Sequence, residues 1–226
     1  MNYYKITDSI DLKEIGVSGQ IQTVFHQLAR EEQVESIYKI NPQKIIDFDF
    51  NPPPFKLERM AKKTDWLNNI FLNQMITISP RFLKMLEQFS LPDHQIFPAR
   101  VFHEDVEFNY FLVYFYPPMQ DKFIDFEESE FVKDYFGAFK NTLEINSLEE
   151  YKVARSQIKL PEGITFSKLV FKKDIPYDIF RFFLLGRGIY ISEKLKNAIQ
   201  EAGLTGMEIT PIEEIKHFYI PWISTC

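Results

Sequence analysis

Ile78-Ser79-Pro80-Arg81-Phe82 and Ile191-Ser192-Glu193-Lys194-Leu195 are two copies of one pattern, and this repetition decides the fold. The matches outside these segments, at the same offset of 113 positions, include Leu72 with Leu185, Leu91 with Leu204, Ile96 with Ile209 and Pro98 with Pro211. Two amphipathic helices can match by chance, but amphipathicity alone would not align the flanking strand residues and the final proline. We therefore predict an internal strand-helix-strand repeat at about residues 64–98 and 177–211.

Each copy is predicted to begin with a strand, at Phe71–Ile78 and Leu184–Ile191, because apolar residues fill alternating or consecutive positions there. Ser79 and Ser192 then stand where a helix N-cap belongs, and a serine hydroxyl can accept a hydrogen bond from a free backbone amide. An apolar stripe at helical spacing follows each serine, and Gly203 can end the second helix in the left-handed conformation. We expect an α+β fold with a mainly antiparallel sheet and both helices packed on it.

Asp65 and Asp178 hold equivalent places just before the first strand of each copy. A paired functional role is one interpretation of this conservation within the chain. The other is structural: an aspartate here can accept hydrogen bonds from nearby backbone amides and fix the start of the unit. We favour the structural interpretation, which predicts that alanine at either position weakens folding by ~0.5–2 kcal/mol.

Further elements are predicted outside the repeat. Asn2–Thr7 is expected to be a strand, and Arg100–His103 with Glu107–Tyr116 an aromatic hairpin that turns near Glu104-Asp105. Glu149–Ile158 is typical of a short helix. Phe166–Lys172 is predicted to be a strand. Helical spacing also occurs in one further segment, whose type of secondary structure the sequence leaves open; its apolar residues are Ile21, Val24, Phe25 and Leu28.

The clearest break in the chain is Asn51-Pro52-Pro53-Pro54. Three prolines fix φ and remove backbone donors, so this segment is an extended connector rather than the interior of an element. We expect an N-terminal segment, residues 1–54, packed on a body of residues 55–226, the two forming one compact unit.

Composition narrows the class of protein. Of the 226 residues 45% are hydrophobic and 16% aromatic, which is enough to bury a substantial core. A formal net charge of −6 argues against nucleic acid as the main ligand and leaves a basic protein partner open. There is no apolar run of the ~20 residues that cross a membrane, and no secretory signal. With one cysteine, Cys226, these features predict a cytoplasmic location without membrane association.

The residue patterns of catalytic, metal and cofactor sites are weak. The four histidines do not pair at metal-ligand spacing, and no phosphate-binding loop occurs, so we expect no metal and no cofactor. One acidic cluster interleaves with phenylalanines, and its members are Asp125, Glu127, Glu128 and Glu130. Carboxylates such as Asp125 and Glu128 could converge for acid–base chemistry. The interpretation we favour is a strand end or loop with a solvated acidic rim, which could also contact a basic partner.

Taken in order, a set of segments resembles a bacterial immunity-protein family that accompanies polymorphic toxins, of the immunity family 11/43 type. The resemblance covers roughly residues 55–212, and its spacing is more specific than any single segment. The segments are Ala61–Leu67, Ile78–Leu83, Phe97–Val101, Tyr110, Ile124–Phe126 with Ser129 and Phe131, Glu150-Tyr151, Tyr177–Phe180, Ile191–Leu195 and Leu204–Met207.

The resemblance implies an intracellular protein that binds and neutralises a cognate toxin. No catalytic residues belong to the family pattern, so the protein is expected not to be an enzyme. The acidic residues Asp125, Glu127, Glu128 and Glu130 are the candidate toxin-binding residues, and the toxin is expected to be basic. Two alternatives stay open: a small enzyme with convergent carboxylates, and a structural or scaffolding module without a toxin partner. The oligomeric state is left open.

Overall fold

The computed structural model describes residues 2–41, 44–72, 74–115, 122–135, 138–159, 162–172, 175–181 and 188–212. Within these residues the chain forms three sheets, and all but one of the strand pairs in them are antiparallel. The α+β class is therefore confirmed. His217 and Cys226, and residues 184–187 of one predicted strand, lie outside the described residues.

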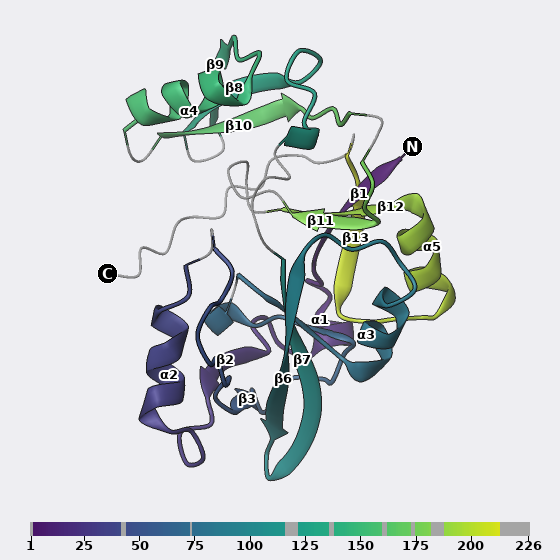
Figure 1. Ribbon diagram of the computed structural model, residues 1–226. Helices are drawn as coiled ribbons and strands as arrows, with labels where there is room; N and C mark the ends of the chain where they lie inside the picture. The colour runs from purple at the N-terminus through teal and green to yellow at the C-terminus, as the bar shows by residue number, and fades with distance from the viewer. Residues whose placement is uncertain are drawn as a thin grey trace.

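The largest sheet has six strands in the order β2-β3-β6-β7-β5-β4, and it occupies the lower part of Figure 1. Its strands are β2 (Ile21–Val24), β3 (Phe55–Leu57), β4 (Trp66–Leu67), β5 (Ile76–Ile78), β6 (His94–His103) and β7 (Val106–Phe115). The helices near it are α1 (Leu12–Ile15), α2 (Glu31–Tyr38) and α3 (Pro80–Leu86). The predicted hairpin is confirmed and longer than expected, since β6 and β7 pair from His94 with Phe115 to His103 with Val106.

A four-stranded sheet, in the order β11-β12-β1-β13, and a three-stranded sheet, in the order β10-β8-β9, complete the fold. The strands of the first are β1 (Tyr3–Asp8), β11 (Ile179–Arg181), β12 (Ile189–Ser192) and β13 (Met207–Pro211), with helix α5 (Glu193–Glu201). The elements of the second are β8 (Glu130–Tyr135), β9 (Ala138–Leu143), β10 (Glu162–Lys168) and α4 (Leu148–Gln157). The predicted helix at 149–158 is thus confirmed as α4. The strand predicted at 166–172 begins and ends earlier, as β10.

The internal repeat is confirmed by the strand registers. In the first unit (residues 64–98), Trp66 pairs with Ile78; in the second unit (residues 177–211), Ile179 pairs with Ile191. The residues of each pair differ by the predicted offset of 113. Helices α3 and α5 follow β5 and β12 in the two units and lie side by side in Figure 1.

The strand predicted at 71–78 is wrong in its first half. Ile70–Leu72 is a 3₁₀ turn, and only Ile76–Ile78 is a strand. The side chain of Asn69 explains the difference, because its Oδ1 accepts hydrogen bonds from the backbone amides of Phe71 and Leu72, both at 3.1 Å. This local contact competes with a strand ladder for the same donors. The helical spacing noted at Ile21 and Val24 also belongs to a strand, β2.

A core shared by both units lies between the two larger sheets. Phe82 and Leu86 of α3 and Leu195 and Ile199 of α5 are buried in one cluster together with Ile78. Because each helix buries its apolar stripe against residues of both units, neither unit has a separate core. Burying side chains of this size contributes ~1.5–3 kcal/mol each.

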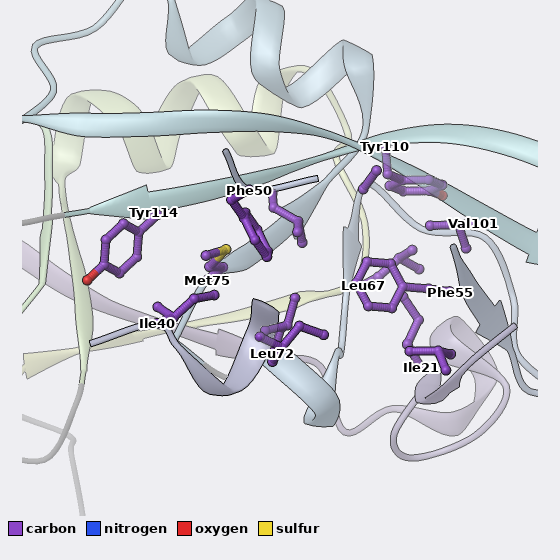
Figure 2. Close-up of a cluster of buried hydrophobic side chains, with 14 of the residues drawn as sticks. Ile21, Ile40, Phe50, Phe55, Leu67, Leu72, Met75, Val101, Tyr110 and Tyr114 are labelled. Carbon is purple, nitrogen blue, oxygen red and sulfur yellow. The ribbon is translucent and has the colours of Figure 1, made fainter. Parts of the chain in front are cut away.

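A second cluster fills the other face of the six-stranded sheet (Figure 2). Phe55 and Leu72 are fully enclosed there, while two tyrosines at its margin keep their hydroxyls bonded to backbone carbonyls. Tyr110 donates to Thr64 O at 3.0 Å, and Tyr114 donates to Lys44 O at 2.8 Å. Burial, with a smaller contribution from the charge of Asp65, raises the pKa of Tyr110 to about 12. The rings of these tyrosines therefore pack in the core, while their neutral hydroxyls hold the backbone at residues 44 and 64 by hydrogen bonds.

Candidate partner-binding surface

The acidic cluster lies on the loop that leads into β8 and on the first residue of that strand, and this stretch (residues 125–130) is called the acidic loop. The backbone of residues 170–172 holds it. Asp125 N donates to Val170 O at 2.9 Å, and Lys172 N donates to Phe123 O at 2.8 Å. An isolated antiparallel bridge joins Ile124 to Phe171 between these bonds. The base of the acidic loop is thus fixed like a short piece of sheet.

Ser129 closes the loop. Its amide donates to Asp125 O at 3.0 Å, and its buried Oγ accepts from Val170 N at 2.9 Å. Within the turn, Asp125 Oδ1 accepts from Glu128 N at 3.3 Å. The carboxylates of this loop are therefore carried by a backbone that is pinned at both ends.

Alternation of aromatic and acidic residues decides which side chains face outward. Phe126 and Phe131 are buried and stacked, with ring centroids 5.5 Å apart. Glu127 and Glu128, which directly precede Ser129 on the same loop, are exposed. Because the rings occupy the interior of the small sheet layer, the glutamates are turned to its surface.

An open hollow of about 540 Å³ lies beside the loop. Its charged lining is mixed, and the lining residues are Lys122, Ile124, Asp125, Phe126, Glu127, Asn146, Ser147, Leu148, Glu149 and Lys172. The start of α4 forms one wall: Ser147 caps the helix, since its Oγ accepts from Glu150 N at 3.1 Å, and Glu150 Oε2 accepts from the amide of the preceding residue, Asn146, at 2.7 Å. Both of these backbone donors are thus satisfied by side chains of the same segment.

The four predicted acidic residues do not all share this hollow. Asp125 and Glu127 line it, whereas Glu128 and Glu130 are not among its lining residues. Glu130 begins β8, and its Oε2 accepts from Ser167 Oγ at 3.2 Å. Asp125 and Glu128 are the pair considered for acid–base chemistry. The Asp125 carboxylate contacts the backbone amide of Glu128, and only Asp125 of the two residues lines the hollow.

Sequence reasoning missed three charged residues of the hollow, namely Lys122, Glu149 and Lys172. A signal for Glu149 was present, since Ser147 followed three residues later by Glu150 is the sequence of a capping box. The two lysines belong to no such sequence motif. Lys172 reaches the hollow only through the pairing of residues 123–125 with residues 170–172, which joins segments far apart in the chain.

The serines Ser79 and Ser192 are the N-cap residues of α3 and α5. Ser79 Oγ accepts from Phe82 N at 3.1 Å, and Ser192 Oγ accepts from Leu195 N at 3.2 Å. Gly203 follows the second helix with φ +59°, the left-handed conformation expected for it.

The three described histidines contact neighbouring loops or a threonine. His94 Nδ1 lies 2.8 Å from Pro92 O, His103 Nε2 lies 3.1 Å from Arg59 O, and His26 Nε2 lies 3.3 Å from Thr23 Oγ1. In the part of the chain that the structure describes, no group of three or more His, Cys, Asp and Glu side chains could hold a metal ion. None of the helices described has the length and apolar character needed to cross a membrane.

The family model Imm43, described as immunity protein 43, matches residues 57–221, which is most of the chain. The match includes both units of the repeat and the acidic loop. Among curated proteins, no match was found.

Proposed function

The chain belongs to the immunity protein 43 family, and from this premise we propose that it binds a cognate toxin protein and neutralises it inside the bacterial cell that carries both. The observation that carries the proposal is the extent of the family match, which spans the repeat, the small sheet layer and the acidic loop. The mode of action proposed is stoichiometric binding rather than chemistry on the toxin.

We place the toxin-binding surface on the acidic loop, at Asp125, Glu127, Glu128 and Glu130. Two features support this placement. The loop backbone is held by the bonds of Asp125 and Ser129 described above, so little conformational entropy would be lost on binding. The exposed glutamates would attract a basic protein and speed its encounter with this surface.

The hollow beside the loop adds apolar contact surface to the acidic rim. Ile124, Phe126 and Leu148 contribute apolar surface to its lining, next to charges of both signs. Binding energy in protein interfaces is concentrated where an apolar or aromatic side chain fills such a recess, and the charged rim mainly sets specificity. We propose that a side chain of the toxin occupies this hollow while basic residues of the toxin face Glu127 and Glu128.

The domain organisation proposed is a single unit. Strand β1, from the predicted N-terminal segment, is an inner strand of the four-stranded sheet, and both of its neighbours belong to the body. The boundary at residue 54 stays a prediction.

Co-expression with the toxin encoded beside the gene tests the function. Cells that make both proteins are expected to survive, and the two proteins to co-elute in a complex of defined stoichiometry. Cell death with and without this protein, together with separate elution, would contradict the proposal. A catalytic mechanism would instead be indicated if substoichiometric amounts of this protein inactivated the purified toxin.

A further inference from the structure

The centre of the four-stranded sheet is formed by a segment distant in sequence from its neighbours. Strand β1 lies between β12 and β13 and pairs with both. Ile6 is opposite Ile189 on one side and opposite Ile209 on the other. Without residues 3–8, therefore, β12 and β13 of the second unit would be separated by an empty slot one strand wide.

In the first unit the same slot is filled by a strand of the adjacent hairpin. Strand β7 lies between β5 and β6, and Val113 is opposite both Ile76 and Ile96. Ile76 and Ile96 are the repeat equivalents of Ile189 and Ile209, so Ile6 stands where Val113 stands. The correspondence continues along the strand, because Tyr4 is opposite Ile191 and Pro211, and Phe111 is opposite their equivalents Ile78 and Pro98.

Three side chains of β1, at positions 4, 6 and 8, lie on one face of the strand, and each makes a different kind of contact. Ile6 is 2% exposed and belongs to the core cluster of both units. The ring of Tyr4 lies 4.7 Å from the ammonium of Lys196, and Asp8 Oδ1 accepts from Trp66 Nε1 at 2.6 Å. An aromatic residue, a β-branched residue and an acid at alternate positions thus have three separate contact sites.

We propose that the slot between β12 and β13 is a binding site for an extended peptide of the type aromatic-x-isoleucine-x-acceptor, in which the last residue is Asp or Asn, and that residues 3–8 of the same chain are its ligand. A peptide adds to such a slot through backbone hydrogen bonds on both edges, while alternate side chains provide the specificity. The covalent link from Asp8 to α1 is dispensable for this recognition, because the contacts that select the strand come from the second unit, from Trp66 and, for the buried ring of Tyr3, from Phe171 and Phe180.

The experiment uses the full chain with a site-specific protease sequence, in a short Gly-Ser linker, inserted between Ile10 and Asp11. Ile10 is 80% exposed, so the insertion leaves the buried part of β1 intact. After cleavage of the folded protein, the N-terminal fragment is expected to co-elute with the remainder at a ratio of one to one. A labelled synthetic peptide of residues 1–10 is expected to exchange into the cleaved protein.

Two variant peptides make the test specific. Ile6→Lys is expected to weaken binding by about a hundredfold or more, because a charge would enter a core position. Thr7→Ala, at an exposed position of the same strand, is expected to exchange like the native peptide. Release of the fragment on cleavage, with or without unfolding of the remainder, would overturn the proposal, as would equal binding of the Ile6→Lys peptide. An intact chain that elutes as a dimer, and that an excess of the peptide of residues 1–10 converts to monomers, would assign the strand to a second copy and overturn the intramolecular assignment.

Discussion

Asp65 and Asp178 are equivalent residues of the two units, and each carboxylate joins its own unit to the other one. Asp65 Oδ1 accepts from Ser79 Oγ at 2.7 Å, and Asp178 Oδ1 accepts from Ser192 Oγ at the same distance. The second oxygens cross over: Asp65 Oδ2 accepts from Thr205 N at 3.1 Å, and Asp178 Oδ2 accepts from Ser90 N at 3.0 Å. The structural interpretation of these aspartates therefore extends to the contact between units.

We expect Asp65→Ala and Asp178→Ala each to lower the free energy of unfolding by about 2 kcal/mol, the upper end of the value predicted from capping alone. The loss of stability is expected at this upper end because a backbone amide of the other unit also loses its acceptor. Urea denaturation of each variant measures the change. Asp65→Asn is the informative control: an amide can still accept from Ser79, but its NH₂ group would face Thr205 N, so this variant is expected to be destabilised as well.

Toxin binding provides a separate test of the same residues. On folded protein, the Asp65→Ala and Asp178→Ala variants are expected to bind the toxin like the native chain, because both carboxylates are engaged within the fold. If toxin binding is lost at an unchanged melting temperature, these aspartates are interface residues and the structural interpretation is wrong.

Gly206→Ala is expected to lower the free energy of unfolding by about 3 kcal/mol or more. Gly206 has φ +94°, and an added Cβ would lie 2.1 Å from Trp66 O and 2.6 Å from Thr64 Oγ1. The two units approach closely here, so the backbone of one of them would have to move. Gly163→Ala is the matched control, since nothing lies within 4 Å of its added Cβ; it should change stability by less than about 0.5 kcal/mol. Equal stability of the two variants would contradict the close approach.

Asp8→Asn is expected to stabilise the protein at neutral pH. Burial raises the pKa of the Asp8 carboxyl, and the hydrogen bond from Trp66 only partly opposes this effect. A raised folded-state pKa means that the folded protein favours the protonated carboxyl, so its stabilising contribution is present in acid and is lost as the pH rises through the folded pKa. Asparagine keeps an acceptor for Trp66 without the charge.

The measurement is urea denaturation of both proteins from pH 3 to pH 8. The stability gained by Asp8→Asn should be largest at neutral pH and should shrink toward acid. Asp93→Asn removes the same charge from an exposed site and is expected to leave the stability nearly unchanged. A gain that is independent of pH would show that the charge of Asp8 is not its cause.

Neutralising the acidic loop is expected to slow association with the toxin by about tenfold at low salt. The variant carries Asp125→Asn, Glu127→Gln, Glu128→Gln and Glu130→Gln. Its control carries Glu31→Gln, Glu35→Gln, Glu87→Gln and Asp93→Asn, four exposed acids elsewhere on the surface. Both variants lose four negative charges, so only the position of the charge differs. Stopped-flow association rates at two salt concentrations measure the effect. Equal slowing of both variants would show that the binding surface is not on this loop, and it would not bear on whether the protein binds the toxin elsewhere.

The sequence by itself determined the features that depend on neighbouring residues and on repetition. The serine N-caps, the left-handed Gly203 and the hairpin turning at Glu104-Asp105 follow from local hydrogen bonding and backbone conformation. The offset of 113 between Ile78 and Ile191 fixed the register of the second unit to the residue, because a one-residue slip would turn every buried side chain outward.

Only the tertiary structure decided how distant segments complete each other. The pairing of Ile6 with Ile189 and Ile209, the bond from Thr205 to Asp65, and the placement of Lys172 beside Asp125 all join residues far apart in the chain. Such contacts depend on which surfaces remain free once the local elements have formed, and these surfaces cannot be predicted from any local sequence pattern. Asn69 shows the same limit at short range: its side chain captures the amides of Phe71 and Leu72, and a segment with the pattern of a strand becomes a turn.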